Sequence, residues 1–182
     1  ILFTYLMMPL KTALNAISML FVDNAVNAIS GDVLQMPFPV MLFMIGIFGP
    51  FCEEFIFRGF FFRGYKNSGS VFWAIFWSAL LFGLMHLNFN QAAYAIAIGI
   101  LFGMLVEATG SLWSSVIAHM VFNSHQVCMM YLFDLLPEEL AGAEEVLTQE
   151  LLITAIGPYL LIAAVATPLA VCTLVWMSKN EK

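Results

Sequence analysis

Charged residues are scarce in this 182-residue chain. They make up 10% of the sequence, against about 25% in an average soluble domain, while hydrophobic residues make up 62%. Only six residues are lysine or arginine, and the net charge of -6 argues against nucleic acid as a partner. Mean hydropathy is +0.94. The composition therefore excludes an ordinary soluble domain and predicts an integral multi-pass membrane protein surrounded by a lipid bilayer.

Cysteine is rare as well. The three cysteines (Cys52, Cys128 and Cys172) are an odd number and form no CxxC pair. This pattern excludes a disulfide framework and a thiolate zinc site. The chain also has no signal-peptide pattern, because Ile1 lies inside a hydrophobic stretch without a basic n-region or a small-residue cleavage site. We expect an N-terminal portion to precede Ile1.

Long apolar runs make up most of the chain, and the length of each run is near the ~20 residues that a bilayer core requires. The runs cover residues 1–22, 38–62, 71–87, 91–108, 111–133 and 151–178. They predict an all-α fold, a polytopic membrane helix bundle of about six transmembrane helices in a single transmembrane domain, 1–182. Half of the twelve acids lie in 134–150, which we expect to be an acidic extramembrane loop before the C-terminal transmembrane helix 151–178.

Basic residues beside the runs predict the orientation of the chain. Arg63 and Lys66 follow the second run and Lys179 follows the sixth, so an even number of spans separates them. The positive-inside rule then places both chain termini in the cytoplasm. Lys11 does not fit this pattern, because it lies in the middle of the first run. We expect that run to be tilted, interfacial or broken at Pro9.

Three charges, Glu53, Glu54 and Arg58, lie inside the second run. Ionisable groups in a membrane span cost several kcal/mol and usually face a protein interior or a water-filled cavity. Glu54 and Arg58 are spaced i to i+4, with the acid first, which predicts an ion pair on one helix face. Glu53 is turned about 100° away and lacks a local partner, so we interpret it as a proton-handling carboxylate. A purely structural ion pair is the alternative interpretation.

Two further runs each carry a histidine. His86 lies near the end of the third run, and His119 lies in the fifth. Asn123 follows His119 by four residues, so one helix face presents an imidazole and a carboxamide to the same volume. A single histidine in a span is more often an interhelical hydrogen bonder than a catalyst. Together with Glu53, however, these side chains indicate a functional site.

These residues form three motifs in order, on three separate runs. They read Glu53-Glu54-x-x-x-Arg58, Phe82-x-x-x-His86 and His119-x-x-x-Asn123. The set resembles the EExxxR, FxxxH and HxxxN motifs of the CPBP intramembrane proteases, a family that includes type II CAAX prenyl endopeptidases and bacteriocin-related Abi proteins. The resemblance covers residues 38–133, which we expect to be the catalytic core, with its site on spans two, three and five.

The resemblance implies an intramembrane endopeptidase that hydrolyses a peptide bond in a membrane-associated peptide or protein. Glu53 with His86 would activate a water molecule, and His119 and Asn123 would stabilise the oxyanion. Carboxylate, imidazole and amide groups suit these tasks. The predicted ion pair would hold the shape of the site.

Cofactor use stays open at this point, because the family has been described both as metalloproteases and as glutamate-dependent enzymes. No HExxH motif is present, yet Glu53, His86 and His119 could complete an open zinc site. We expect no cofactor, since the face carrying His119 and Asn123 suits a pair of hydrogen-bond donors better than a ligand set. Zinc or another divalent metal is the alternative.

Two other functions compete with proteolysis. A non-proteolytic membrane scaffold or bacteriocin-immunity protein of the same family could retain the motifs for packing. A proton or ion pathway is less favoured, because the spans offer too few aligned ionisable groups. The sequence leaves the substrate, its prenylation and the oligomeric state open.

Depth in the membrane raises a difficulty for this site. Helix rise places Glu53 and His119 ~12 to 15 Å from the side of the basic loop, but His86 ~24 Å from it. We therefore expect the third run to start deeper than residue 71, to be tilted or to be re-entrant.

Overall fold

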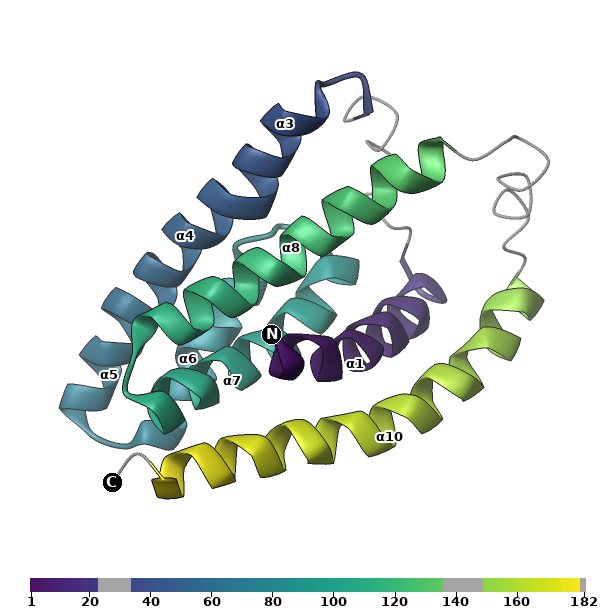
Figure 1. Cartoon of the computed structure of the whole chain (residues 1–182). Coiled ribbons are helices and arrows are strands. Elements are labelled where there is room, and N and C mark those ends of the chain that lie inside the picture. Colours follow the sequence, from purple (N-terminus) through teal and green to yellow (C-terminus); the bar gives the residue numbers. More distant parts are fainter. Residues whose placement is uncertain (23–33, 136–148, 181–182) are drawn as a thin grey trace.

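The structure, a computed structural model, describes residues 1–22, 34–135 and 149–180, and this part of the chain contains helices but no strands (Figure 1). One long helix runs without a break from Phe38 to Ser68 and passes through five segments. These are α3 (Phe38–Met41), η1 (Leu42–Phe48), α4 (Gly49–Glu54), η2 (Phe55–Phe62) and α5 (Arg63–Ser68), of which η1 and η2 are π-helical. The other helices are α1 (Leu2–Met19), α6 (Val71–Leu84), α7 (Phe89–Thr109), α8 (Leu112–Asp134) and α10 (Gln149–Asn180).

The predicted helical membrane bundle is confirmed. Each of the six apolar runs corresponds to a helix in the described part of the chain. Three helical stretches there are long and apolar enough to cross a membrane: Phe38–Ser68, Phe89–Thr109 and Ile156–Lys179. Val71–Leu84 is apolar but shorter. Most of the predicted acidic loop, residues 136–148, lies outside the described residues.

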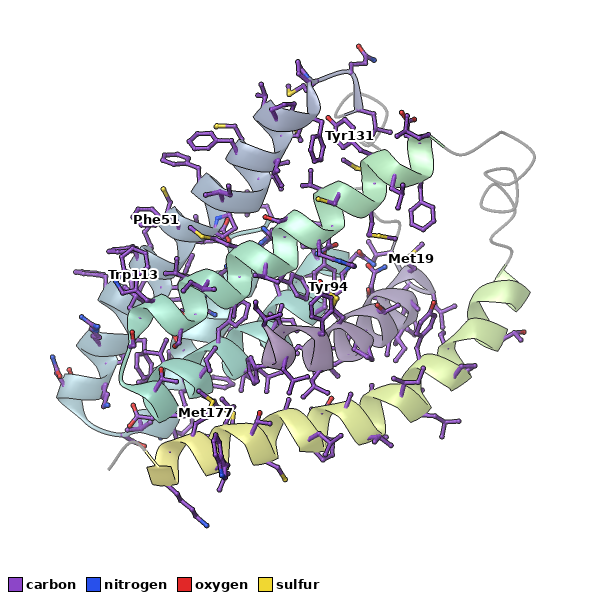
Figure 2. The ribbon with its side chains drawn as sticks, viewed as in Figure 1. Met19, Phe51, Tyr94, Trp113, Tyr131 and Met177 are labelled. Carbon is purple, nitrogen blue, oxygen red and sulfur yellow. The ribbon has the colours of Figure 1, made fainter. Side chains whose placement is uncertain are left out.

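The apolar outer surface of the bundle agrees with this assignment. Large hydrophobic side chains stand exposed on several helices, including Phe60, Trp73 and Leu161. Aromatic side chains also join neighbouring helices, and Figure 2 shows Phe51 of α4 beside Trp113 of α8, with ring centroids 6.2 Å apart. Such a surface suits a hydrocarbon solvent, since lipid satisfies apolar side chains and the helices satisfy their own backbone groups.

Helices α7 and α8 occupy the centre of the bundle. Helix α8 lies against η1, α4, α7 and α1, while α7 packs against α6, α1, α8 and α10 (Figure 1). The largest apolar core lies where α1, α7, α8 and α10 meet, and it includes Met7, Phe102, Phe122 and Leu174. Polar side chains from the second, third and fifth predicted spans are therefore brought toward one interior.

Small residues allow α6 and α7 to pack closely. A Cβ atom at Gly99 would lie 3.1 Å from the Cβ of Ala79, and one at Gly103 would lie 3.3 Å from Cγ1 of Ile75. Close backbone approach of this kind stabilises helix pairs in membranes through van der Waals contact. The α6–α7 pair is thereby held at a distance that larger side chains would not permit.

Several predicted boundaries were wrong. The second helix was predicted to end at Phe62 but continues to Ser68, where Lys66 forms an ion pair with Glu107 of α7, with Nζ 2.6 Å from Oε2. The first helix is not broken at Pro9. Helix α6 ends at Leu84, because Leu87 adopts a left-handed φ of 52° and turns the chain toward α7.

The longer second helix changes the comparison of depth between Glu53 and His86. Because the turn to α6 lies at residues 69 and 70 rather than at 63, the two residues stand equally many residues from it. His86 lies two residues beyond Leu84, where α6 ends, so its depth also depends on the connection to α7.

A bulky residue at the α6–α7 contact should destabilise the bundle. We expect Gly103→Leu to lower the free energy of unfolding by about 1–3 kcal/mol through overpacking against Ile75. Gly64→Leu is the matched control, because a Cβ atom at Gly64 would meet nothing within 4 Å. Thermal unfolding in detergent measures both, and equal unfolding temperatures for the two variants would contradict the packing described here.

Candidate active site within the bundle

A fully buried ion pair forms the base of the site. Arg58 Nη1 donates to Glu54 Oε1 at 2.8 Å, and both side chains have 0% exposure. Arg58 Nη2 also donates to the carbonyl of Gly99 at 3.0 Å, and the guanidinium lies 4.5 Å from the centroid of the Phe82 ring. A Cβ atom at Gly99 would lie 3.0 Å from Nη2, so the absence of a side chain there lets the α7 backbone reach the arginine.

His119 joins this pair to the neighbouring glutamate. Its Nδ1 lies 3.0 Å from Glu54 Oε1, and its Nε2 lies 3.9 Å from Glu53 Oε2. An ionised carboxylate only accepts hydrogen bonds, so Nδ1 is the donor to Glu54. The imidazole is also fixed by the rings of Phe82 and Phe102, whose centroids lie 5.7 and 5.1 Å away.

The two glutamates have different surroundings although they are adjacent in sequence. The side chain of Glu53 is 36% exposed, whereas that of Glu54 is fully buried. The helical turn of about 100° between them explains the difference. Glu54 is held by Arg58 and His119, while the carboxylate of Glu53 is partly exposed.

His86 lies on the short connection between α6 and α7. Its Nδ1 is 2.8 Å from the carbonyl of Phe82, and because a carbonyl only accepts, Nδ1 donates and Nε2 is left for other partners. Its ring packs edge-on against the Phe82 ring at 5.0 Å. The connection is short because Asn88 caps α7, its side chain accepting from the Asn90 N–H at 3.0 Å.

Asn123 contacts the π-helical segment η1 of the long helix. Its Nδ2 donates to the carbonyl of Ile45 at 3.2 Å, and Ser124 Oγ donates to the carbonyl of Gly46 at 3.2 Å. An N–H at position 50 would serve one of these carbonyls, Gly46 in an α-helical pattern or Ile45 in a π-helical pattern. Pro50 has no N–H, so the helix lacks one donor here, and α8 provides donors to both carbonyls from two consecutive side chains.

A small cavity of ≈ 60 Å³ lies beside these groups. His86, His119 and Asn123 line it, and so do apolar and polar side chains of α6, α7 and α8: Phe82, Gln91, Tyr94, Ala95, Ile98, Phe122 and Gln126. Glu53 is not part of the lining, but its Oε2 lies 3.9 Å from Nε2 of His119. The space suffices for a few water molecules, and its polar lining offers them partners.

The structure thus brings the predicted site residues together, in two overlapping groups that share His119. Sequence reasoning gave no role to Phe82, whose carbonyl and ring contact His86 and whose ring also faces Arg58. It also missed Gly99 as the acceptor for Arg58. The sequence signal at Gly99 is a run of small residues between 92 and 103, which is typical of close helix packing and does not predict a hydrogen bond to Arg58.

The three potential metal ligands are not arranged as a metal centre. No group of three His, Cys, Asp or Glu side chains that could hold a metal ion occurs in residues 1–22, 34–135 and 149–180. Nδ1 of His119 is engaged by Glu54 and Nδ1 of His86 by a backbone carbonyl. Each histidine therefore keeps Nε2 for one further partner.

These features define a class of protein: a helical membrane bundle with an internal site of carboxylate, imidazole and amide groups. A family model described as type II CAAX prenyl endopeptidase Rce1-like matches residues 35–125, a range that contains all three motifs. The chain belongs to this family, and the resemblance found in the sequence is confirmed.

Two curated relatives support the family assignment. The chain is 32% identical over 98 residues to YdiL of Bacillus subtilis, a membrane peptidase by its name, with 54% of this chain and 40% of YdiL covered. It is 31% identical over 120 residues to the membrane-embedded CAAX protease MroQ of Staphylococcus aureus, with 62% and 47% covered. The chain thus spans less than half the length of these relatives. No solved structure matches the chain.

Breaking the buried ion pair should cost more than removing both charges. We expect Arg58→Met to lower the free energy of unfolding by about 3–5 kcal/mol, because Glu54 is left buried without its counter-ion. Adding Glu54→Gln should recover at least ~1 kcal/mol of that loss. Chemical or thermal unfolding of the single and double variants measures the coupling, and additive losses would contradict it.

The contact between Asn123 and Ile45 should depend on Pro50. Asn123→Leu leaves the Ile45 carbonyl without its donor, and we expect a loss of about 1–3 kcal/mol in unfolding free energy. In a Pro50→Ala background the restored N–H can serve the helix, so the same substitution should cost less. Unfolding temperatures of the four proteins test this, and an equal cost in both backgrounds would refute it.

Proposed function

We propose that this protein is an intramembrane endopeptidase that hydrolyses a peptide bond in a membrane-associated peptide or protein. One observation carries the proposal: His86, His119 and Asn123 line a single cavity in the bundle, and Glu53 reaches His119 with its Oε2 3.9 Å from Nε2. Membership of the CAAX endopeptidase family and the names of both relatives support a protease.

Glu53 and His86 activate water in the proposed reaction. The partly exposed carboxylate of Glu53 removes a proton from a water molecule in or beside the cavity, and the resulting hydroxide attacks the peptide carbonyl. Nε2 of His86, which the Phe82 contact leaves available, orients that water. Collapse of the tetrahedral intermediate transfers the proton to the leaving amine, and the products are a carboxylate and an amine.

His119 and Asn123 stabilise the oxyanion that forms on the carbonyl oxygen. An amide carries two N–H donors, so Asn123 can hold Ile45 with one and the oxyanion with the other. His119 uses Nδ1 for Glu54 and therefore donates from Nε2 only as an imidazolium. Such a charge is balanced, because two carboxylates and one guanidinium surround it.

Glu54 and Arg58 act as positioning residues. Glu54 orients the His119 imidazole, as carboxylates do for histidines in many active sites, and Arg58 keeps Glu54 ionised and in place. The basic residues predict that both chain termini lie in the cytoplasm. Substrates of the proposed enzyme would be segments of membrane-associated proteins.

Loss of the carboxylate should abolish cleavage without unfolding the protein. We expect Glu53→Gln and His86→Ala each to lower kcat at least ~100-fold on peptides that the wild type cleaves, because general-base catalysis contributes about that much. A panel of prenylated and leader-type fluorogenic peptides in nanodiscs provides the measurement. We expect a chelator to leave the wild-type rate unchanged, and inhibition by the chelator would support the zinc alternative.

His125→Ala is the matched control, because this third histidine packs against Tyr5, with ring centroids 5.6 Å apart, and does not line the cavity. It should retain wild-type turnover. Wild-type turnover in Glu53→Gln would overturn the proposal. A silent panel in every variant would favour the scaffold or immunity function instead.

A further inference from the structure

The connection that carries His86 is not held in place by apolar burial. The side chains of Met85, Leu87 and Phe89 are exposed, and that of Leu87 is 94% exposed. Leu87 also adopts a left-handed φ of 52°, a backbone conformation that costs free energy in a leucine. The position of His86 therefore depends on other contacts of this connection.

A buried amide fastens the connection to α1. Asn90 of α7 follows His86 by four residues and has 0% exposure. Its Nδ2 donates to Ser18 Oγ at 2.6 Å and to the carbonyl of Asn15 at 3.4 Å. Both acceptors lie at the end of α1 that Met19 marks in Figure 2. The start of α7 is thus tied to a helix outside the α6–α7 pair.

These bonds are concentrated on one residue. All hydrogen bonds that residues 85–91 make to described helices other than α6 and α7 involve Asn90, either through its Nδ2 or through its carbonyl, which lies 3.4 Å from Ser18 Oγ. The remaining bonds of the connection are local, such as that of His86 to the Phe82 carbonyl. Loss of the Asn90 amide would therefore release the connection from α1.

The Asn90 amide also carries a cost in stability. A carbonyl only accepts hydrogen bonds, so the amide N–H group faces Asn15. The Oδ1 atom of Asn90 is then buried without a hydrogen-bond partner among the described residues. An unpaired buried acceptor lowers stability, and departures of this kind are expected at functional sites.

We propose that Asn90 and Ser18 form a positioning pair that holds His86 at the cavity. In the proposed reaction His86 orients the water that Glu53 deprotonates, and a displacement of about 1 Å in such a group can cost about 100-fold in rate. The inference rests on the proposed function and adds two residues to it. Helix α1, which carries none of the three motifs, thereby becomes part of the site.

Kinetics of variants at the pair test this role. We expect Asn90→Ala to lower kcat about 10- to 100-fold and to leave KM near wild type, because His86 acts on the water and not on the bound peptide. Ser18→Ala should lower kcat less, since the Asn15 carbonyl still accepts from Asn90. Each rate is measured well below the unfolding temperature of the variant. Ser18→Ala also keeps the test possible if Asn90→Ala does not fold.

A double-variant cycle shows whether the two residues act together. Ser18→Ala should have almost no further effect on kcat in Asn90→Ala, because the bond between them is already lost. Ser78→Ala is the matched control, since this fully buried hydroxyl donates within α6, to the carbonyl of Ile75. It should keep wild-type kcat. Losses in kcat that simply multiply in the double variant would contradict the pair.

A spin label makes the test independent of turnover. A nitroxide is attached at Met85→Cys, next to His86 and exposed, after the three native cysteines are replaced by alanine. Its electron paramagnetic resonance line shape in nanodiscs reports the mobility of the connection. The label should be restricted in the otherwise unchanged protein and in Ser78→Ala, and more mobile in Asn90→Ala and Ser18→Ala.

The two readouts separate the positioning pair from the protease itself. A more mobile label together with a lower kcat supports the pair. Unchanged line shapes in both variants overturn it, and so does wild-type kcat in Asn90→Ala of a cleaving enzyme. If no peptide is cleaved by any variant, the proposed function fails by itself, and the line shapes alone decide whether Asn90 and Ser18 hold the connection.

Discussion

The buried ion pair between Glu54 and Arg58 is the interaction on which the rest of the site depends. Two full charges in a membrane bundle are tolerated only when each is paired and hydrogen-bonded. Their contacts extend to three other helices: Arg58 reaches the carbonyl of Gly99 on α7 and the ring of Phe82 on α6, and Glu54 holds His119 on α8. Satisfying one buried pair therefore fixes the relative positions of four helices.

The same contacts give the two adjacent glutamates, Glu53 and Glu54, different roles. Glu54 is held by Arg58 and His119, while Glu53, turned about 100° around the helix, lies beside His119 and is partly exposed. A missing backbone N–H group also helps to position a side chain of the site. Pro50 withholds a backbone donor, and Asn123 is drawn to the carbonyl that is left. A backbone carbonyl that lacks its helical donor and a buried ion pair thus hold the polar groups of the proposed reaction in place.

The helices were predicted correctly, and the candidate site residues were selected, because both depend on local signals in the sequence. Apolar runs locate spans, and the i, i+4 spacing of Glu54 with Arg58 and of His119 with Asn123 assigns faces. The end of the second helix could not be predicted in this way, since Arg63, Gly64 and Lys66 are typical of a loop, whereas α5 packs against α6 and continues the helix to Ser68. The roles of Phe82 and Gly99 were likewise hidden, because they act through backbone carbonyls and close approach. Lys11 had no partner that could be predicted from the sequence, and in the structure Gln126 and Tyr94 lie beside it.

The central claim is that a tetrahedral intermediate forms between Glu53 and the donors on α8. The most direct measurement is an experimental structure of the protein with a peptide analogue whose cleavable carbonyl is replaced by a phosphinate group. The account predicts one phosphinate oxygen within hydrogen-bond distance of His119 Nε2 and Asn123 Nδ2, and the other near Glu53 and His86. An analogue bound away from these four side chains, with Asn123 and His119 contacting only protein, would contradict it.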